Sequence, residues 1–304
     1  MPRFDVTVAG ELNLDLILYG LPRRRAPERE YLATDCSLTL GSSSAIFAHN
    51  LACLGNRVGF ASRIGDDLLG HAARRALAAA RVDVSQVKSA RTPPSGVTIV
   101  IAQPKGREIL TYPGAISALR RADLDLSYLS RARHFHLASY FLHRQLRPQL
   151  PRLFASLRAA GLTTSLDTND DPEGRWDGGL ARLLPHVDVL FFNAREAAHL
   201  RPVLAEAACP RLLVVTKRGA RGAVARRGRE RWSAPAVTAA RVDTVGAGDS
   251  FDAGFIHQFI RGAAMDACLR FANRAGALSI TRAGGVAAFC DHAHARRFMR
   301  AALG

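Results

Sequence analysis

The sequence lacks an apolar run long enough to cross a bilayer, because Arg, Gly or Pro interrupts each of its longest hydrophobic stretches within a few residues. The N-terminal segment, MPRFDVTVAGELNLDLIL, has one Arg and a short apolar strand that Asp5 interrupts. A secretory signal needs a longer apolar stretch and a small-residue cleavage site. We therefore expect no membrane partner and a cytoplasmic location.

Cysteine is scarce, and its spacing is uninformative. The sequence contains no CxxC pair, and its five cysteines are Cys36, Cys53, Cys209, Cys268 and Cys290. An odd, scattered set argues against both a disulfide framework and a cysteine-based zinc site. We expect buried free thiols.

Acidic residues are too few to balance the basic ones: 26 against 42 gives a net charge of +16. A nucleic-acid-binding protein would concentrate its charge in one arm or stripe. Here the arginines are spread along the chain, with short clusters at 23–25, 226–231 and 296–300, and no nucleic-acid-binding motif accompanies them. We expect solvated surface arginines and no nucleic-acid partner.

What the sequence does contain is a repeated alternation of β-prone and helix-prone segments. Helices are expected at 45–54 and 68–80, and strands at 4–10, 57–65, 134–139, 163–169, 187–193 and 211–219. This alternation predicts one α/β domain over residues 1–304, with a mostly parallel sheet covered by helices on both faces. Ligands of such sheets bind beyond the carboxyl ends of the strands. Polar clusters fall there, at 167–171, 193–196 and 217–222.

Two segments break the alternation, residues 14–40 and 92–113. Both are short, β-prone and rich in turn residues, and VTIVIAQPKGREILTY predicts a hairpin around Pro104, Lys105 and Gly106. We expect these segments to form a small β-flap on the α/β body.

The strongest local signal is DTVGAGDSF, residues 243–251, followed by apolar residues at helical spacing. Small residues at a helix start let a phosphate approach the free backbone N–H groups. Asp249 on that turn would lie beside the transferring phosphoryl group, where a general base is needed. A tight connection with a first-turn Asp is the alternative, and spacing alone favours it. The motif is neither GxxxxGK[ST] nor a complete GxGxxG.

DTVGAGDSFDAGF closely resembles the C-terminal signature of the ribokinase-like (PfkB) carbohydrate kinases. The resemblance implies a three-layer α/β/α fold with a mostly parallel central sheet and a small β-flap that acts as a lid. It implies that Asp249 is the catalytic base and that the amides of Gly246, Ala247 and Gly248 form an anion hole for the γ-phosphate of ATP. Asp243 matches a position that in many members helps to hold a monovalent cation, so K⁺ is a further candidate cofactor.

The resemblance extends along the whole chain on the acceptor side. GELNLDLIL is similar to the family's substrate strand, in which Asn13 and Asp15 match residues that bind sugar hydroxyls. LGSSSAIFAHNLACLG is similar to the first signature, which places Gly41, Ser42 and Ser43 at the sugar. RIGDDLLG, residues 63–70, is a further family hallmark of structural weight.

The nucleotide side also has family-like motifs. Asn193 and Glu196 match an NxxE element that positions Mg²⁺ and phosphate, chiefly through water; from the residues alone they also form a capping box. LVVTKRGARGAV resembles a loop that lines the nucleotide. The implied ATP-binding residues are Asn193, Lys217, Gly219, Gly222 and, at the adenine-side wall, Asn273.

His134 and His136 fall on one face of an expected strand, but no third metal ligand has convincing spacing. We expect packed or pocket-lining histidines rather than a metal site.

Departures from the family pattern leave the acceptor open. Ile46 stands where ribokinases characteristically carry a ribose-contacting Asn, Ser42 replaces a second Gly, and Ala288 stands where potassium-activated members often have Ser.

We expect ATP-dependent phosphorylation of a hydroxyl, most simply a primary one, of a sugar or related polyol. The alternatives are a nucleoside kinase, for which Phe47, Tyr140 and Phe141 could supply an aromatic wall, and a non-catalytic sensor. An exposed flap edge favours a homodimer formed through the β-flap.

Overall fold

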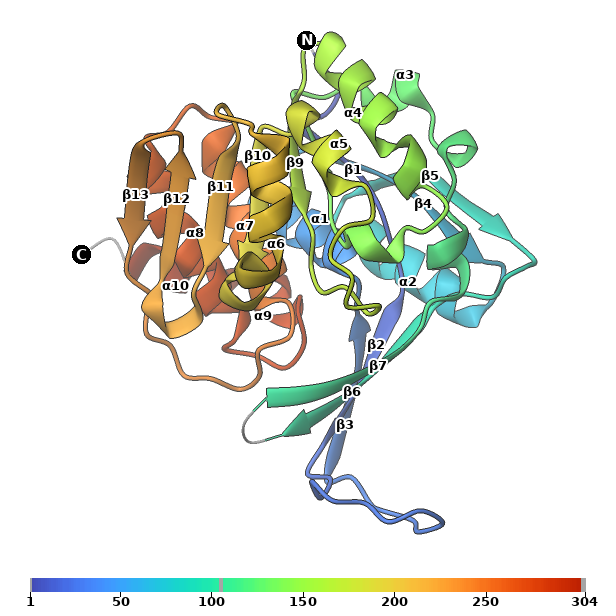
Figure 1. Cartoon of the computed structure of the whole chain (residues 1–304). Coiled ribbons are helices and arrows are strands. Elements are labelled where there is room, and N and C mark those ends of the chain that lie inside the picture. Colours follow the sequence, from blue (N-terminus) through green and yellow to red (C-terminus); the bar gives the residue numbers. More distant parts are fainter. Residues whose placement is uncertain (1, 104–105, 302–304) are drawn as a thin grey trace.

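The computed structural model describes residues 2–103 and 106–301, which form a large sheet between two helical layers and a smaller sheet that projects from it (Figure 1). Within these residues the large sheet has nine strands in the order β13-β12-β11-β10-β9-β8-β1-β4-β5. Pairing is parallel except where β12 and β13 join at one edge. The strands are β1 (Val6–Ala9), β4 (Val58–Gly65), β5 (Asp83–Ala90), β8 (His134–Leu137), β9 (Thr163–Asp167), β10 (Val189–Asn193), β11 (Leu213–Lys217), β12 (Ala223–Arg227) and β13 (Glu230–Ala234).

Helices cover both faces of this sheet, as the strand–helix alternation predicts. One layer consists of α1 (Ser43–Cys53), α2 (Leu68–Ala79), α7 (Ala247–Phe259) and α8 (Met265–Ser279), with α9 (Ala287–Cys290) and α10 (His292–Ala301) packed against α8. The other consists of α3 (Leu126–Leu129), α4 (Leu150–Ala159), α5 (Leu180–Leu183) and α6 (Ala194–Ala207). The predicted three-layer α/β/α architecture is confirmed.

Two hydrophobic cores result because neighbouring side chains of a strand point to opposite faces. Along β10, Val189 and Phe191 join the core under α1 and α7, whereas Leu190 and Phe192 join the core under α4 and α6. The continuous apolar run VLFF therefore reads as a strand that is buried on both sides.

The smaller sheet is the flap, with strand order β3-β2-β6-β7. It contains β2 (Leu14–Tyr19), β3 (Asp35–Leu40), β6 (Val97–Gln103) and β7 (Gly106–Tyr112). Only residues 10–13 separate β1 from β2, so the flap begins where the central strands of the large sheet end (Figure 1). The predicted hairpin is present, but Pro104 and Lys105 of its turn lie outside the described residues.

The expectation of buried thiols is largely wrong. Cys268 is buried, Cys53 and Cys209 are half-buried, and Cys36 and Cys290 are exposed. Cys36 lies on flap strand β3, where only one sheet face can be covered, and Cys290 ends the short surface helix α9. Over the described residues, no helix is both long and apolar enough to cross a membrane.

Candidate active site

The GAG turn forms the start of α7, as the sequence predicts. Gly246 has φ 70° and is the N-cap of the helix. A Cβ at Gly246 would lie 2.5 Å from Gly285 Cα, and one at Gly248 would lie 3.3 Å from Lys217 Nζ. Glycine thus allows a left-handed turn, close backbone packing and a cation beside the helix amides. These amides and the helix dipole can stabilise an anion.

Asp249 lies in the first turn of α7 and lines a cavity of about 160 Å³ between the body and the flap. Burial raises the pKa of Asp249 to about 6, with Lys217 opposing the rise, Asp167 adding to it, and a hydrogen bond from Ser43 opposing it. A carboxyl group with this pKa is ionised at neutral pH and is more basic than an ordinary aspartate. The geometry therefore suits proton removal from a hydroxyl in this cavity, which we call the acceptor cavity.

Four of the predicted acceptor residues, Asn13, Asp15, Ser42 and Ser43, line the acceptor cavity together. The Asn13 side chain is oriented by hydrogen bonds with Thr98, at 3.1 Å, and with Ser42. Burial and the nearby charge of Asp249 raise the pKa of Asp15 to about 7.

Gly41 does not line the acceptor cavity, but it makes room for a residue that does. A Cβ at Gly41 would fall 1.9 Å from Asp15 Oδ1. We therefore expect Gly41 to act by allowing the Asp15 carboxylate to face the cavity.

Glu11 is a buried member of the acceptor cavity that the sequence interpretation missed. Its carboxylate accepts hydrogen bonds from the Ser44 amide (3.0 Å) and hydroxyl (2.7 Å), from Ser139 Oγ (2.7 Å) and from His143 Nε2 (3.1 Å). Burial alone would raise the pKa of Glu11, but His143 and Ser44 hold it at about 2. The alternation Glu11, Asn13, Asp15 was the available signal, since it continues the polar face by one step.

On the nucleotide side, Asn193 and Glu196 form the capping box of α6 that their spacing predicts. The Glu196 carboxylate accepts from the Asn193 amide at 2.8 Å and from its side chain. Burial and the charge of Asp167 raise the pKa of Glu196 to about 7. With its oxygens bonded in this way, Glu196 suits contact with a hydrated Mg²⁺ through water better than direct ligation.

Lys217, at the end of β11, forms a buried ion-pair triad. Its Nζ lies 2.6 Å from Asp167 Oδ2 and 3.0 Å from Asp252 Oδ2, and its side chain is only 13% exposed. Burial alone would lower the pKa of Lys217, but Asp167, Asp252 and Glu196 raise it, so the ammonium stays charged beside Gly248. Asp252 was not predicted; it lies one turn of α7 beyond Asp249.

Two of the remaining nucleotide-side residues, Gly222 and Asn273, meet at the end of β13. A Cβ at Gly222 would lie 2.1 Å from Ala234 O, and Asn273 Nδ2 donates to Ala234 O at 3.2 Å and to Pro235 O at 2.8 Å. Gly219 is exposed and has φ +56°. None of these three lines the acceptor cavity.

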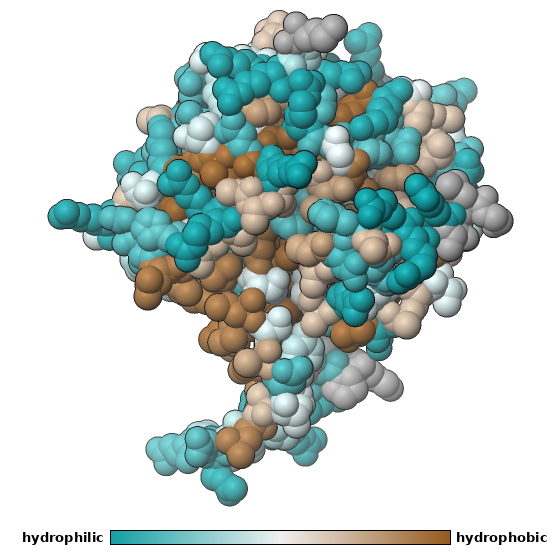
Figure 2. Space-filling view, turned by 180° about the vertical axis from the view of Figure 1, so that it is seen from behind, coloured by the Kyte–Doolittle hydropathy of each residue, from teal (hydrophilic) through white to brown (hydrophobic). Residues whose placement is uncertain are grey.

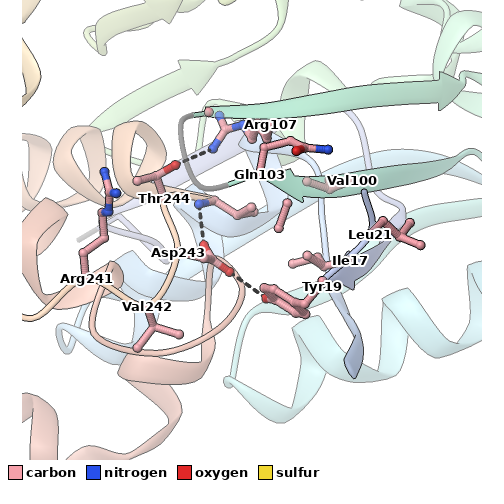
Figure 3. Close-up of a pocket in the computed structure, with 14 residues that line it drawn as sticks. Ile17, Tyr19, Leu21, Val100, Gln103, Arg107, Arg241, Val242, Asp243 and Thr244 are labelled. Carbon is pink, nitrogen blue, oxygen red and sulfur yellow. Dashed lines mark hydrogen bonds between the residues drawn. The ribbon is translucent and has the colours of Figure 1, made fainter. Parts of the chain in front are cut away.

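The carboxylate of Asp243 is already bonded on both oxygens. Oδ1 accepts from the Val245 amide at 2.6 Å, and Oδ2 accepts from Tyr19 Oη at 3.0 Å (Figure 3). Oδ2 also accepts from the Gly284 amide at 2.7 Å. A carboxylate has about four acceptor positions, and the two amides point N–H dipoles at it. Asp243 is therefore a poor fit to a cation.

His134 and His136 are packed residues, as expected. His134 Nε2 and His136 Nδ1 each form a hydrogen bond with Ser165 Oγ at 2.7 Å. The His136 ring stacks on Phe47. In the described part of the chain, no group of three or more His, Cys, Asp or Glu side chains is arranged to hold a metal ion directly.

A family model described as "pfkB family carbohydrate kinase" matches residues 3–290. The chain belongs to the PfkB carbohydrate kinase family. A similar curated relative, the ATP-dependent ribose-1-phosphate kinase of Halopiger xanaduensis, is 31% identical over 287 residues, covering 92% of this chain and 93% of that protein. As a PfkB family member the protein is an ATP-dependent carbohydrate kinase, of the group that phosphorylates sugars or nucleosides.

Solved PfkB-type structures have the same fold. The adenosine kinase of Sinorhizobium meliloti superposes with a TM-score of 0.83 at 22% identity, covering 97% of this chain and 99% of that one. An Escherichia coli structure assigned as ribokinase II, in complex with ATP and Mg²⁺, gives 0.80 at 21% identity, covering 98% and 99%. At these identities the structures establish the ribokinase-like fold. The roles of the individual site residues stay predictions.

Proposed function

We propose that this PfkB kinase transfers the γ-phosphoryl group of ATP to a hydroxyl, most simply a primary one, of a sugar or related polyol bound in the acceptor cavity. One observation carries the proposal: the Asp249 carboxylate lines that cavity from the same helical turn whose amides at 246–248 can hold a phosphate. Base and anion hole are thus fixed to one rigid element, which favours a constant geometry between the two substrates.

The acceptor would be oriented before it reacts. Asp15 and Glu11 offer carboxylate oxygens to sugar hydroxyls, while the Asn13 amide both donates and accepts. The acceptor oxygen attacks the γ-phosphorus as its proton passes to Asp249. The bond between that phosphorus and the bridging oxygen of ADP breaks, and its electron pair leaves with ADP. The amides at 246–248 and the Lys217 ammonium stabilise the negative charge on the transferring group.

Magnesium is proposed as the cofactor on the nucleotide side. Asn193 and Glu196 would hold it through water, which agrees with a buried carboxylate whose oxygens are already bonded at close range. When bound, the ion neutralises phosphate charge. Lys217, Gly219, Gly222 and Asn273 are proposed to contact ATP.

A monovalent cation at Asp243 is not part of the proposed mechanism. Three donors already occupy its carboxylate, and the buried Ala288 offers no side-chain oxygen. Equal rates in K⁺ and in a tetraalkylammonium salt of equal ionic strength are expected.

Sugar is favoured over nucleoside because no aromatic side chain that could stack on a base is among the described residues that line the acceptor cavity. Phe47, Tyr140 and Phe141 are all buried in the cores and do not line the cavity. A non-catalytic sensor would have no need of Asp249.

The decisive experiment is a thermal-shift screen against sugars, polyols and nucleosides, with and without ATP·Mg²⁺, followed by measurement of ADP formation for each ligand that shifts the protein. A sugar that raises the midpoint and gives Asp249-dependent ADP formation supports the proposal. If only nucleosides raise the midpoint and give ADP formation, the nucleoside kinase is supported. If ligands raise the midpoint without ADP formation, the non-catalytic sensor is supported.

We further propose that two copies pair through the outer face of the flap. The strand register places the apolar side chains of Leu16, Leu18, Leu38, Ile99 and Leu110 on that face, around the buried Ile101. Leu38 and Leu110 are 60% and 49% exposed. Viewed from behind, hydrophobic residues gather where the flap leaves the body (Figure 2). Mutual burial of the two faces would remove this surface from water.

A further inference from the structure

A second cavity lies beside the acceptor cavity, between the inner face of the flap and the loop 241–245 (Figure 3). This flap cavity measures about 460 Å³, against about 160 Å³ for the acceptor cavity. Three residues, Val100, Arg107 and Val245, line both. The two cavities therefore adjoin at these residues, and Arg107 is the charged side chain among the three.

Two arginines give the flap cavity its charge. Arg107 reaches it from flap strand β7 and donates to Thr244 Oγ1 at 3.2 Å, and Arg241 reaches it from the loop of the body (Figure 3). Within residues 2–103 and 106–301, neither guanidinium forms an ion pair with a carboxylate, although many other arginines of this chain do. Both charges remain available to a ligand.

The one acid among the described residues of this cavity offsets only part of their charge. Asp243 is the only carboxylate among the described lining residues, and it directs both oxygens to Tyr19 Oη and to the amides of Val245 and Gly284. Arg107 also acts on the acceptor cavity, where its charge opposes the raised pKa of Asp15. Glu11, Asp15 and Asp249 make the acceptor cavity acidic, so an anionic group is favoured on the flap-cavity side of Arg107, where two guanidinium groups face one carboxylate among the described lining residues.

The flap cavity also has an apolar part, beside the polar side chains of Tyr19, Gln103 and Thr244. Ile17, Val100, Ala102 and Val242 line it, and Ile17, Val100 and Val245 form a small core between flap and loop. A free inorganic anion would leave this apolar surface uncovered, whereas an anionic group carried on a carbon skeleton would cover it and still reach the guanidinium.

We propose that the acceptor is a sugar bearing an anionic substituent, a phosphate monoester or a carboxylate, whose charged oxygens bind Arg107, with Arg241 as a second cation, in the flap cavity. The inference rests on the proposed function, because the reacting hydroxyl of the same molecule lies at Asp249. A guanidinium presents paired donors that match both kinds of oxyanion. Neutral sugars fill only the smaller cavity and forgo these contacts.

The test compares acceptors that differ in charge and retain a primary hydroxyl: D-fructose 1-phosphate with D-fructose, and D-gluconate with D-glucose. We expect the anionic member of at least one pair to have a kcat/KM at least tenfold higher, because charge-assisted hydrogen bonds are the strong ones. The phosphate pair and the carboxylate pair identify which oxyanion the cavity takes. The KM of the preferred acceptor should rise with ionic strength.

Arg107→Met should lower that anionic-to-neutral ratio at least tenfold, mainly through KM, and Arg107→Lys should restore part of it. Arg241→Met should have a smaller effect in the same direction. Arg231→Met, on the exposed edge strand β13, is the matched control and should change neither acceptor. Calorimetry can measure binding of the preferred anion to the Asp249→Asn variant. Adding Arg107→Met to that variant should weaken binding by the same factor by which Arg107→Met lowers the anionic-to-neutral ratio.

Two outcomes would overturn the proposal. In the first, the neutral and the anionic member have the same kcat/KM in both pairs. In the second, Arg107→Met lowers turnover of neutral and anionic acceptors by the same factor. The second result would indicate that Arg107 acts on the transferring phosphate instead. Failure of the proposed function looks different, because then no sugar of either charge gives ADP formation that depends on Asp249.

Discussion

Tyr19 of the flap donates a hydrogen bond to Asp243, the residue that begins the DTVGAGDSF motif, across 3.0 Å and 224 positions of sequence. Burial and the neighbouring Asp243 charge raise the pKa of Tyr19, which keeps its hydroxyl protonated as a donor. Ile17 and Val100 of the flap also pack on Val245. The flap is therefore held to the loop 241–245, which leads into the turn at 246–248.

Tyr19→Phe should loosen this link while keeping the ring. We expect kcat/KM for the acceptor to fall about tenfold, because the hydrogen bond to an ionised carboxylate is lost, with little change in the melting temperature. Tyr112→Phe, at a flap residue that is 51% exposed, is the control. Identical steady-state kinetics for both variants would show that the Tyr19 hydroxyl does not hold the lid.

Asp249→Asn should remove most turnover and leave ATP binding largely intact, because the amide cannot accept the proton. It should also raise the melting temperature by a few degrees at pH 8. The raised pKa of Asp249 means that its ionised form destabilises the folded protein above the ordinary aspartate range. That gain should shrink as the pH falls below 6 and vanish only below the ordinary aspartate pKa of 3.8, where the wild-type group is protonated in both states. Nucleotide calorimetry, single-turnover assays and melting curves at several pH values measure these effects, and near-normal kcat would remove Asp249 from the mechanism.

The pH profile of kcat/KM should have its acidic limb between about 6 and 7, where Asp249 and Asp15 titrate. Activity should rise with pH there, since the base works when deprotonated. Asp15→Asn removes one of the two mutually repelling charges, so the limb should move to lower pH even though the acceptor binds less well. A limb that stays in place would mean that the two carboxylates do not interact.

Lys217→Met should destabilise the protein by about 3–5 kcal/mol, because it leaves Asp167 and Asp252 buried without their cation. Adding Asp252→Asn should recover part of this loss. Lys88→Met, at an exposed position of β5, should be neutral. Denaturant unfolding gives all three values, and equal stability of the two lysine variants would contradict the buried triad.

Leu110→Arg should dissociate the proposed flap-to-flap dimer into monomers that remain folded, because it places a charge on the apolar outer face at edge strand β7. Ala159→Arg, at the exposed end of α4, is the control. Light scattering coupled to size exclusion measures the mass. If the unmodified protein is already monomeric at micromolar concentration, the flap pairing is wrong.

Much of this protein could be predicted from local sequence, because the physics involved is local. Strand–helix alternation gives the α/β/α layers, DTVGAGDSF gives a glycine turn with an acid in the first turn of a helix, and Asn193 with Glu196 gives a cap. Each depends on residues within a few positions of one another, and backbone geometry alone fixes their relation.

Only the tertiary structure decided which distant side chains meet. The contacts of Glu11 with His143, of Lys217 with Asp252 and of Tyr19 with Asp243 join segments separated by 132, 35 and 224 residues. The cysteines were misjudged for the same reason, since composition reports how often a residue type is buried but not which face of an element is covered. The flap cavity with Arg107 likewise exists only because the flap lies over the loop at 241–245, and no spacing within either segment encodes that.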